Sequence, residues 1–288
     1  MAAPDIAKLY SFRNPPLEEV ALAVQFQPSA VSYFHIAALH ERLKGRFPTR
    51  EEQQARPPMS EHLGPPSLRP AFEIEVVAAP VWPRIWLLSQ NGSRLLQLQH
   101  DLFAFNWRRA PGGEEYPRYR QLRRTVVQCL GDLASLVQAD DDHELVPNWC
   151  EVTYINHVAP IEAGGGLPNL DSILQRIAPA RRGGFLPMPE DAQVALRFLI
   201  PGDSGPRGRL TVLANSAIRN EDHVPLWVIT LTARLRVETP TVEGAIATLD
   251  EGRQWVVRAF AELTTDKMHK HWGLEDVGDE EKNVATRS

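Results

Sequence analysis

Apolar and polar residues alternate with a period of two in several short stretches, a pattern typical of half-buried β-strands. In the first stretch, 19–26, Val20, Leu22 and Val24 alternate with polar or small residues. Between two later stretches stands Asn91-Gly92, which is typical of a tight hairpin because both central residues of such a turn need positive φ. This alternation predicts eight strands, at 19–26, 72–78, 84–89, 94–107, 150–158, 192–200, 209–218 and 226–237.

Apolar residues recur every three or four positions between these strands, which predicts amphipathic helices. Ser29 is the expected N-cap of the first helix, because its hydroxyl can accept from a free backbone N–H. Four helices follow from this spacing, at 29–47, 119–137, 169–177 and 241–267.

The order strand, helix, three strands, helix occurs twice, with first strands that begin at 19 and 150. No convincing residue identity links the halves, so the duplication rests on the order of elements. We predict an α+β fold in which two repeated β-α-β-β-β-α units form one mostly antiparallel curved sheet. The strands have polar residues on one face, so the helices should cover the other side of the sheet.

Composition divides the chain into segments. Residues 48–70 are rich in proline and charge, and we expect a mobile loop that proteases cut first. The predicted boundaries are an N-terminal segment at 1–18, a first repeat at 19–139, an acidic linker at 140–149, a second repeat at 150–272 and an acidic, disordered tail at 273–288.

The net charge of −5 over 288 residues argues against a generally basic nucleic-acid binder. The first residues lack the apolar core of a signal peptide, and no window reaches about 18 uninterrupted apolar residues. Cys129 and Cys150 are too few for a disulfide-stapled fold and are expected to be buried, reduced thiols. We expect a cytoplasmic protein with no membrane contact, no cofactor and no metal.

The segment from Gln97 to Leu122 holds the strongest local signal. If 94–107 were one regular strand, three polar and three aromatic residues would follow one another on the same face. They are Gln97, Gln99, Asp101, Phe103, Phe105 and Trp107. A bulge or break near His100–Asp101 would resolve this arrangement.

Two interpretations of this segment stay open. In one, polar residues line a ligand or partner groove on the open face of the sheet: Gln97, Gln99, Asp101, Asn106, Arg108 and Asn156. In the other, the strand face is merely exposed and aromatic residues anchor the following turn. The residues assigned to structure are Trp107, Tyr116, Pro117, Tyr119 and Tyr154. If the groove is open, Gln99→Ala or Arg108→Ala should abolish binding and leave the melting temperature nearly unchanged.

Four motifs carry a resemblance to a known family: N-P-P-L-E-E-V at 14–20, Q-L-Q-x-D-x-F-x-x-N-W-R at 97–108, Y-P-R-Y at 116–119 and V-T-Y-I-N-H-V at 152–158. With them, residues 12 to about 272 resemble a sporadically distributed, uncharacterised bacterial family. The resemblance implies a patchy distribution of the kind found in mobile-element or defence-type loci. It implies no catalytic role for any residue. The family's motif positions here are Gln97, Gln99, Asp101, Asn106, Trp107, Arg108, Tyr116, Pro117, Tyr119, Tyr154 and Asn156.

No phosphate-binding loop, nucleophile motif or metal-ligand spacing occurs in the sequence. The leading hypothesis is therefore a non-enzymatic binding or interaction protein, with another protein as the expected partner and a homo-oligomer left open. The first alternative is an enzyme that uses Asp101, His100 or His157 in a groove between the two halves. The second is single-stranded nucleic-acid binding by aromatic residues and arginines on the open sheet face.

Overall fold

The computed structural model describes most of the chain, namely residues 9–28, 30–61, 63, 83–141, 144–161, 167, 169–175 and 191–277. Two predictions, the strand at 72–78 and the cap at Ser29, lie outside the described residues.

A nine-stranded sheet forms the centre of the molecule, and every pairing between its strands is antiparallel. Its spatial order is β3 (Thr49–Gln53), β4 (Arg84–Leu88), β5 (Arg94–Gln99), β6 (Leu102–Arg108), β2 (Leu17–Phe26), β7 (Pro147–Val158), β10 (Pro225–Arg236), β9 (Gly205–Ile218) and β8 (Gln193–Gly202). The predicted α+β class with a mostly antiparallel sheet is confirmed.

Apart from the edge strand β3, which has no counterpart in the second half, the strand order is symmetric about the central β2–β7 pair. In each half the first strand lies at the centre, and the next strands along the chain return from the edge to pair with it. In the first half, the strands approach β2 in the order β4, β5, β6. In the second half, they approach β7 in the order β8, β9, β10. This order agrees with the repeated units expected from the sequence.

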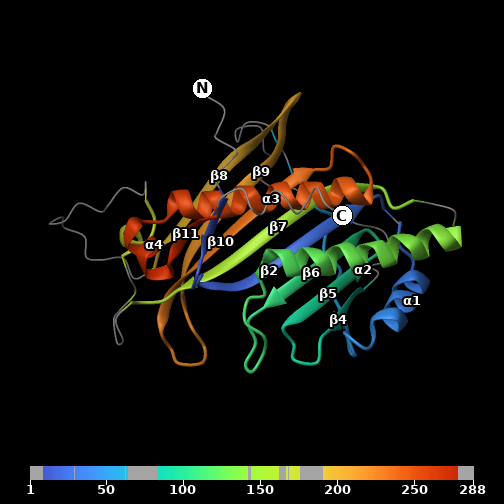
Figure 1. Ribbon diagram of the computed structural model, residues 1–288, viewed down its shortest axis with the longest axis horizontal. Coiled ribbons are helices and arrows are strands. Elements are labelled where there is room, and N and C mark those ends of the chain that lie inside the picture. Colours follow the sequence, from blue (N-terminus) through green and yellow to red (C-terminus); the bar gives the residue numbers. More distant parts are fainter. Residues whose placement is uncertain are drawn as a thin grey trace.

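Helices cover one face of this sheet, as predicted. Figure 1 shows the two long ones, α2 (Arg118–Asp141) and α3 (Val242–Leu263), in front of the strands. The shorter helices are α1 (Tyr33–Leu43), α4 (Asp266–Trp272) and the 3₁₀ turn η2 (Leu170–Ser172). Under the helices, Val20, Leu22 and Val24 of β2 are buried, as their alternation predicted. Burial of each such side chain stabilises the fold by about 1.5–3 kcal/mol.

Helix boundaries follow local capping. Ser32 caps α1 by accepting from the backbone N–H of His35, so the helix begins at Tyr33. The helix predicted at 241–267 ends at Leu263, because the extended backbone of Thr264 separates α3 from α4. In the region predicted as a helix at 169–177, the described residues form only the short turn η2.

The predicted single strand at 94–107 is instead a hairpin, β5–β6, with its turn at His100–Asp101. The turn reverses the chain, and Gln97 then lies opposite Ala104 while Leu96 lies opposite Phe105. The polar side chains of β5 therefore take the open face, and the aromatic side chains of β6 take the helix-covered face. The break expected near His100 is confirmed, and it resolves the mixed face.

Part of the predicted loop at 48–70 is ordered by pairing. Thr49–Gln53 forms the edge strand β3 beside β4. Residues 54–61, named the strap here, lie across the open face of the sheet. Gln25 accepts from the backbone N–H of Met59 and donates to its carbonyl at 3.1 Å. Residues 62 and 64–70 lie outside the described residues.

The chain ends meet in a second, two-stranded sheet. Strand β1 (Leu9–Phe12) pairs with β11 (Leu274–Val277), and this pair is named the terminal ribbon here. The prediction of a disordered tail is wrong for 274–277, because these residues are held by the backbone bonds of β1. The expected linker is also shorter than 140–149, since α2 extends to Asp141 and β7 begins at Pro147.

Both cysteines are free and buried, as expected. Burial raises the pKa of the Cys129 thiol to about 11 and raises that of Cys150 further. In the part of the chain that the structure describes, no helix has the length and apolar character needed to span a membrane.

Candidate functional site

The predicted groove residues of the β5–β6 hairpin are buried and bonded to one another. Gln97 donates to Asn106 at 2.7 Å, and Asn106 donates to Glu19 on β2. Gln99 donates to Asp101 at 2.9 Å, and Asp101 is only 3% exposed. These side chains form a polar network on the open face and do not line an open groove in the described structure.

The strap covers this network. Gln99 accepts from the backbone N–H of Arg56 at 2.9 Å and donates to the carbonyl of Arg56 at 3.0 Å. Further along, Arg209 binds Glu61 at 2.6 Å, and Arg234 donates to Glu151. The strap therefore lies on the polar face, and Arg209 and Arg234 on this face bind carboxylates.

The two remaining candidates, Arg108 and Asn156, lie elsewhere. The Nε of Arg108 donates to the carbonyl of Gly92 at 2.9 Å, which secures the predicted Asn91-Gly92 turn. Asn156 lies on the helix-covered face of β7 and donates to the carbonyl of Ile229 at 3.1 Å. The structure thus does not bring the six predicted residues together.

Of the residues of the enzyme hypothesis, His100 and Asp101 lie 3.8 Å apart, but His157 is far from both. The carbonyl of Asp101 accepts from Phe26 at the end of β2, whereas the N–H of His157 donates to Pro16, just before β2 begins. A ten-residue strand separates these points, a span of about 30 Å. Asp101 and His100 therefore share no catalytic site with His157.

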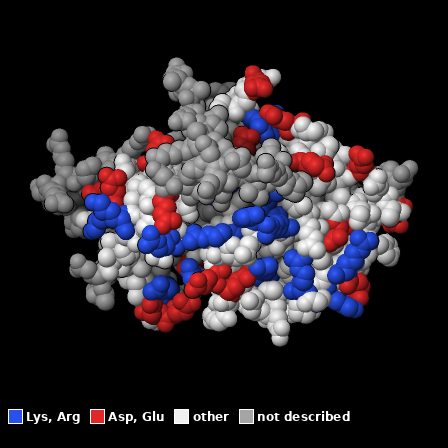
Figure 2. Space-filling model, in the orientation of Figure 1, with Lys and Arg blue, Asp and Glu red and all other residues white. Residues whose placement is uncertain are grey.

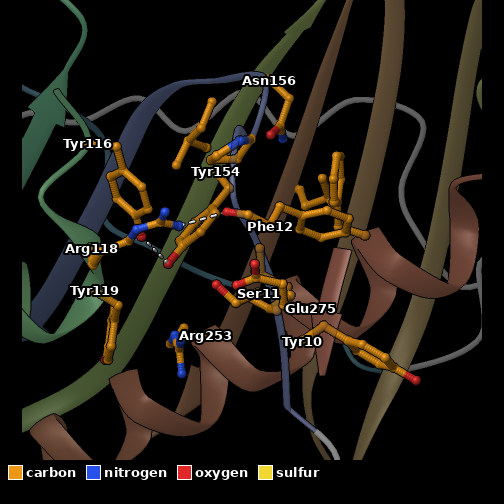
Figure 3. Close-up of a pocket in the computed structure, with 16 residues that line it drawn as sticks. Tyr10, Ser11, Phe12, Tyr116, Arg118, Tyr119, Tyr154, Asn156, Arg253 and Glu275 are labelled. Atoms are coloured by element: carbon orange, nitrogen blue, oxygen red, sulfur yellow. Dashed lines mark hydrogen bonds between the residues drawn. The ribbon is translucent and has the colours of Figure 1, made fainter. Parts of the chain in front are cut away.

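A cavity of about 320 Å³ lies between the sheet, helix α3, the start of α2 and the terminal ribbon. Figure 3 shows Tyr116, Arg118 and Tyr119 on one side of it and Phe12 on the other, with Tyr154 and Asn156 supplied by β7. Its lining joins both halves of the chain: Tyr10, Ser11, Phe12, Pro15, Leu17, Tyr116, Arg118, Tyr119, Tyr154, Asn156, Leu231, Arg253, Val256, Val257, Phe260 and Glu275.

Tyrosines form one wall of this pocket. The hydroxyls of Tyr116 and Tyr154 are 3.5 Å apart, and the ring of Tyr116 packs on Trp107 at 5.2 Å between centroids. Tyr119 donates to Asp250 at 2.8 Å. Burial is the main cause that raises the pKa of Tyr116 and of Tyr119 well above the usual value. Both phenols therefore stay protonated at neutral pH and act as hydrogen-bond donors.

Two guanidinium groups stack on these tyrosines. Arg118 lies 5.8 Å from the ring centroid of Tyr116, and Arg253 lies 4.8 Å from that of Tyr119. Arg118 also donates to the carbonyls of Phe12 at 2.8 Å and of Arg13 at 3.1 Å, which ties α2 to the terminal ribbon.

The local sequence explains this geometry. Pro117 keeps Tyr116 extended, because a proline disfavours helical backbone in the residue before it. Arg118 then enters α2 with a φ of 67°, a conformation that few residues other than glycine adopt. The Y-P-R-Y motif thereby turns both tyrosines and the arginine between them into the pocket wall.

The sequence motifs indicate a structural role for the pocket tyrosines and assign no role to Arg118 and Arg253. One signal was available. Along 150–158, the residues on the core face are apolar or aromatic except Asn156. A polar residue on an otherwise apolar face indicates a buried polar site.

Among the described residues, no group of His, Cys, Asp and Glu side chains is arranged to hold a metal ion. No protein-family model matches the chain, nor does any curated protein or solved structure.

Proposed function

We propose that the chain is a non-enzymatic binding protein and that the pocket between α2, α3, β7 and the terminal ribbon is its binding site. The observation that carries this proposal is convergence: segments from both halves and both chain ends contribute side chains to one cavity. Such a site takes shape only when the whole chain folds.

The size of the cavity favours a small-molecule ligand over the protein partner expected from the sequence. Small-molecule sites occupy about 300–1,000 Å³, are mostly apolar and hold a few placed polar groups. The pocket of about 320 Å³ lies within this size range, and it combines apolar residues such as Phe12, Leu231 and Phe260 with an equal share of polar surface.

The same observations give less support to the alternatives. An enzyme needs its acid, base or nucleophile within hydrogen-bond reach of one substrate, and Asp101 and His157 lie at opposite ends of β2. Nucleic-acid binding on the open face needs available cations, whereas Arg209 and Arg234 there bind Glu61 and Glu151.

Native mass spectrometry of the protein purified from its natural host tests the proposal. Val257 lines the pocket, and Val257→Trp should fill it. Ala247→Trp places the same side chain on an exposed position of α3 and is the matched control. We expect a bound small molecule on the wild type and on Ala247→Trp, and none on Val257→Trp.

Cooperative melting of all three proteins would establish that each is folded. A wild type that carries no small molecule would contradict the proposal. So would a Val257→Trp variant that retains the same ligand.

A further inference from the structure

The chemistry of the pocket wall points to one class of ligand. On one side stand the guanidinium groups of Arg118 and Arg253, beside the phenols of Tyr116 and Tyr154. All four groups are hydrogen-bond donors, and a guanidinium carries five N–H groups in one plane. A wall of this kind is complementary to an acceptor with negative charge.

Cation–π contacts help to position both cations. The guanidinium carbon of Arg253 lies over the ring of Tyr119, 4.8 Å from its centroid, and that of Arg118 lies over the ring of Tyr116 at 5.8 Å. Both Nη atoms of Arg118 also donate to the backbone carbonyls of Phe12 and Arg13. A guanidinium suits a carboxylate or a phosphate, because its N–H groups form a fixed planar fork.

The carboxylates near the pocket have partners of their own. Glu275, the one carboxylate among the lining residues, accepts from Arg13 at 3.1 Å from Nε and 2.7 Å from Nη2. Asp250 accepts from Tyr119 and from Arg123.

The pocket also has apolar lining. Phe12 and Phe260 meet edge to face at 5.3 Å, and Val256 and Leu231 line the same cavity. A ligand in the cavity would place its charged end at the arginines and an aromatic or aliphatic body against these apolar residues.

The surface charge agrees with this orientation. Figure 2 shows Lys and Arg side chains in a band across the helix-covered face, with a row of Asp and Glu side chains beside it. The chain as a whole carries a charge of −5, so this band is opposite in sign to the overall charge. A local positive field raises the association rate of an anion.

We propose that the pocket binds a small organic anion, with a carboxylate or phosphate group held by Arg118 and Arg253 and an apolar body against Phe12 and Phe260. This inference rests on the proposed function of the same pocket and adds the chemical class of the ligand.

Isothermal titration of the full chain with matched probes tests the ligand class. Phenylpropionate and phenyl phosphate carry the two anionic groups, phenylpropanamide is a neutral counterpart, and phenylethylammonium is a cation of similar size. We expect binding of at least one anion, with weaker or no binding of the amide and the ammonium compound. The stronger anion identifies the charged group.

The variant Arg253→Met removes the cation and keeps an aliphatic side chain, so we expect about tenfold weaker binding of the anion. Arg197→Met, on an exposed position of the edge strand β8, is the control and should bind as the wild type does. Arg118 is unsuitable for this purpose, because its bonds also hold the terminal ribbon.

Equal binding of the amide or the ammonium compound would overturn the inference, as would unchanged binding by Arg253→Met or no binding of either anion. The variant Val257→Trp distinguishes an error in the ligand class from an error in the assignment of the pocket as the binding site. If Val257→Trp abolishes binding of the amide, the pocket remains the site and only the ligand class is wrong. If it leaves binding of the anion unchanged, the pocket assignment fails.

Discussion

Some of the polar and aromatic side chains stabilise the fold, and others line the pocket. A side chain that is fully buried and hydrogen-bonded belongs to the first group. Gln99 is 2% exposed and exchanges two hydrogen bonds with the backbone of Arg56. Tyr116 and Arg118 border a cavity. From sequence alone, glutamine and aspartate are the natural choice for a polar groove, and tyrosine is the natural choice for a core.

The Gln99→Ala variant should therefore lose stability. The substitution removes both hydrogen bonds to the backbone of Arg56, and each such bond contributes about 0.5–1.5 kcal/mol to stability. Trp107→Ala should cost about 3–5 kcal/mol through the cavity it creates. Denaturant unfolding measures both, and Arg197→Ala, a surface change, should stay within about 0.5 kcal/mol of the wild type.

If Gln99→Ala unfolds with the same midpoint as Arg197→Ala, the strap is not held by this residue. In that case Gln99 would be a candidate for binding.

At the scale of elements, hydrophobic periodicity predicted most of the strands and helices. It missed β3 because an edge strand such as 49–53 has five polar residues, so no face is apolar and no alternation appears. It merged β5 with β6 because the turn at His100–Asp101 contains no glycine or proline. Both features depend on which strands pair in the folded protein, and the hydrophobic pattern of a single sequence does not show strand pairing.

Two glycines in the long helices should respond in opposite ways to substitution. Gly131, on an exposed part of α2, has open space where a Cβ would stand, so Gly131→Ala should stabilise by about 0.5–1 kcal/mol. A Cβ at Gly252 of α3 would lie 2.9 Å from Val152 of β7, so Gly252→Leu should destabilise the protein.

Thermal or denaturant unfolding compares the two glycine variants directly. A Gly252→Leu variant as stable as the wild type would contradict the close packing of α3 on β7. A loss of stability in Gly131→Ala would contradict the exposed position of Gly131.

At the scale of the whole molecule, the two halves share one sheet across β2 and β7, and the terminal ribbon brings residues 9–12 to 274–277. The repeated order of elements made this sheet predictable. The pocket was not predictable, because it depends on side chains as distant in sequence as Phe12, Tyr116 and Arg253. No local pattern encodes that convergence.

Hydrogen exchange of the whole chain, with and without a small-molecule extract of its natural host, tests the central claim that this pocket is a ligand site. A bound ligand should slow exchange in the terminal ribbon and in the first turn of α2, because it would contact Phe12 and Arg118 there. Exchange in the edge strand β8 should not change. Unchanged exchange at the ribbon and at the start of α2, or protection confined to β8, would contradict this claim.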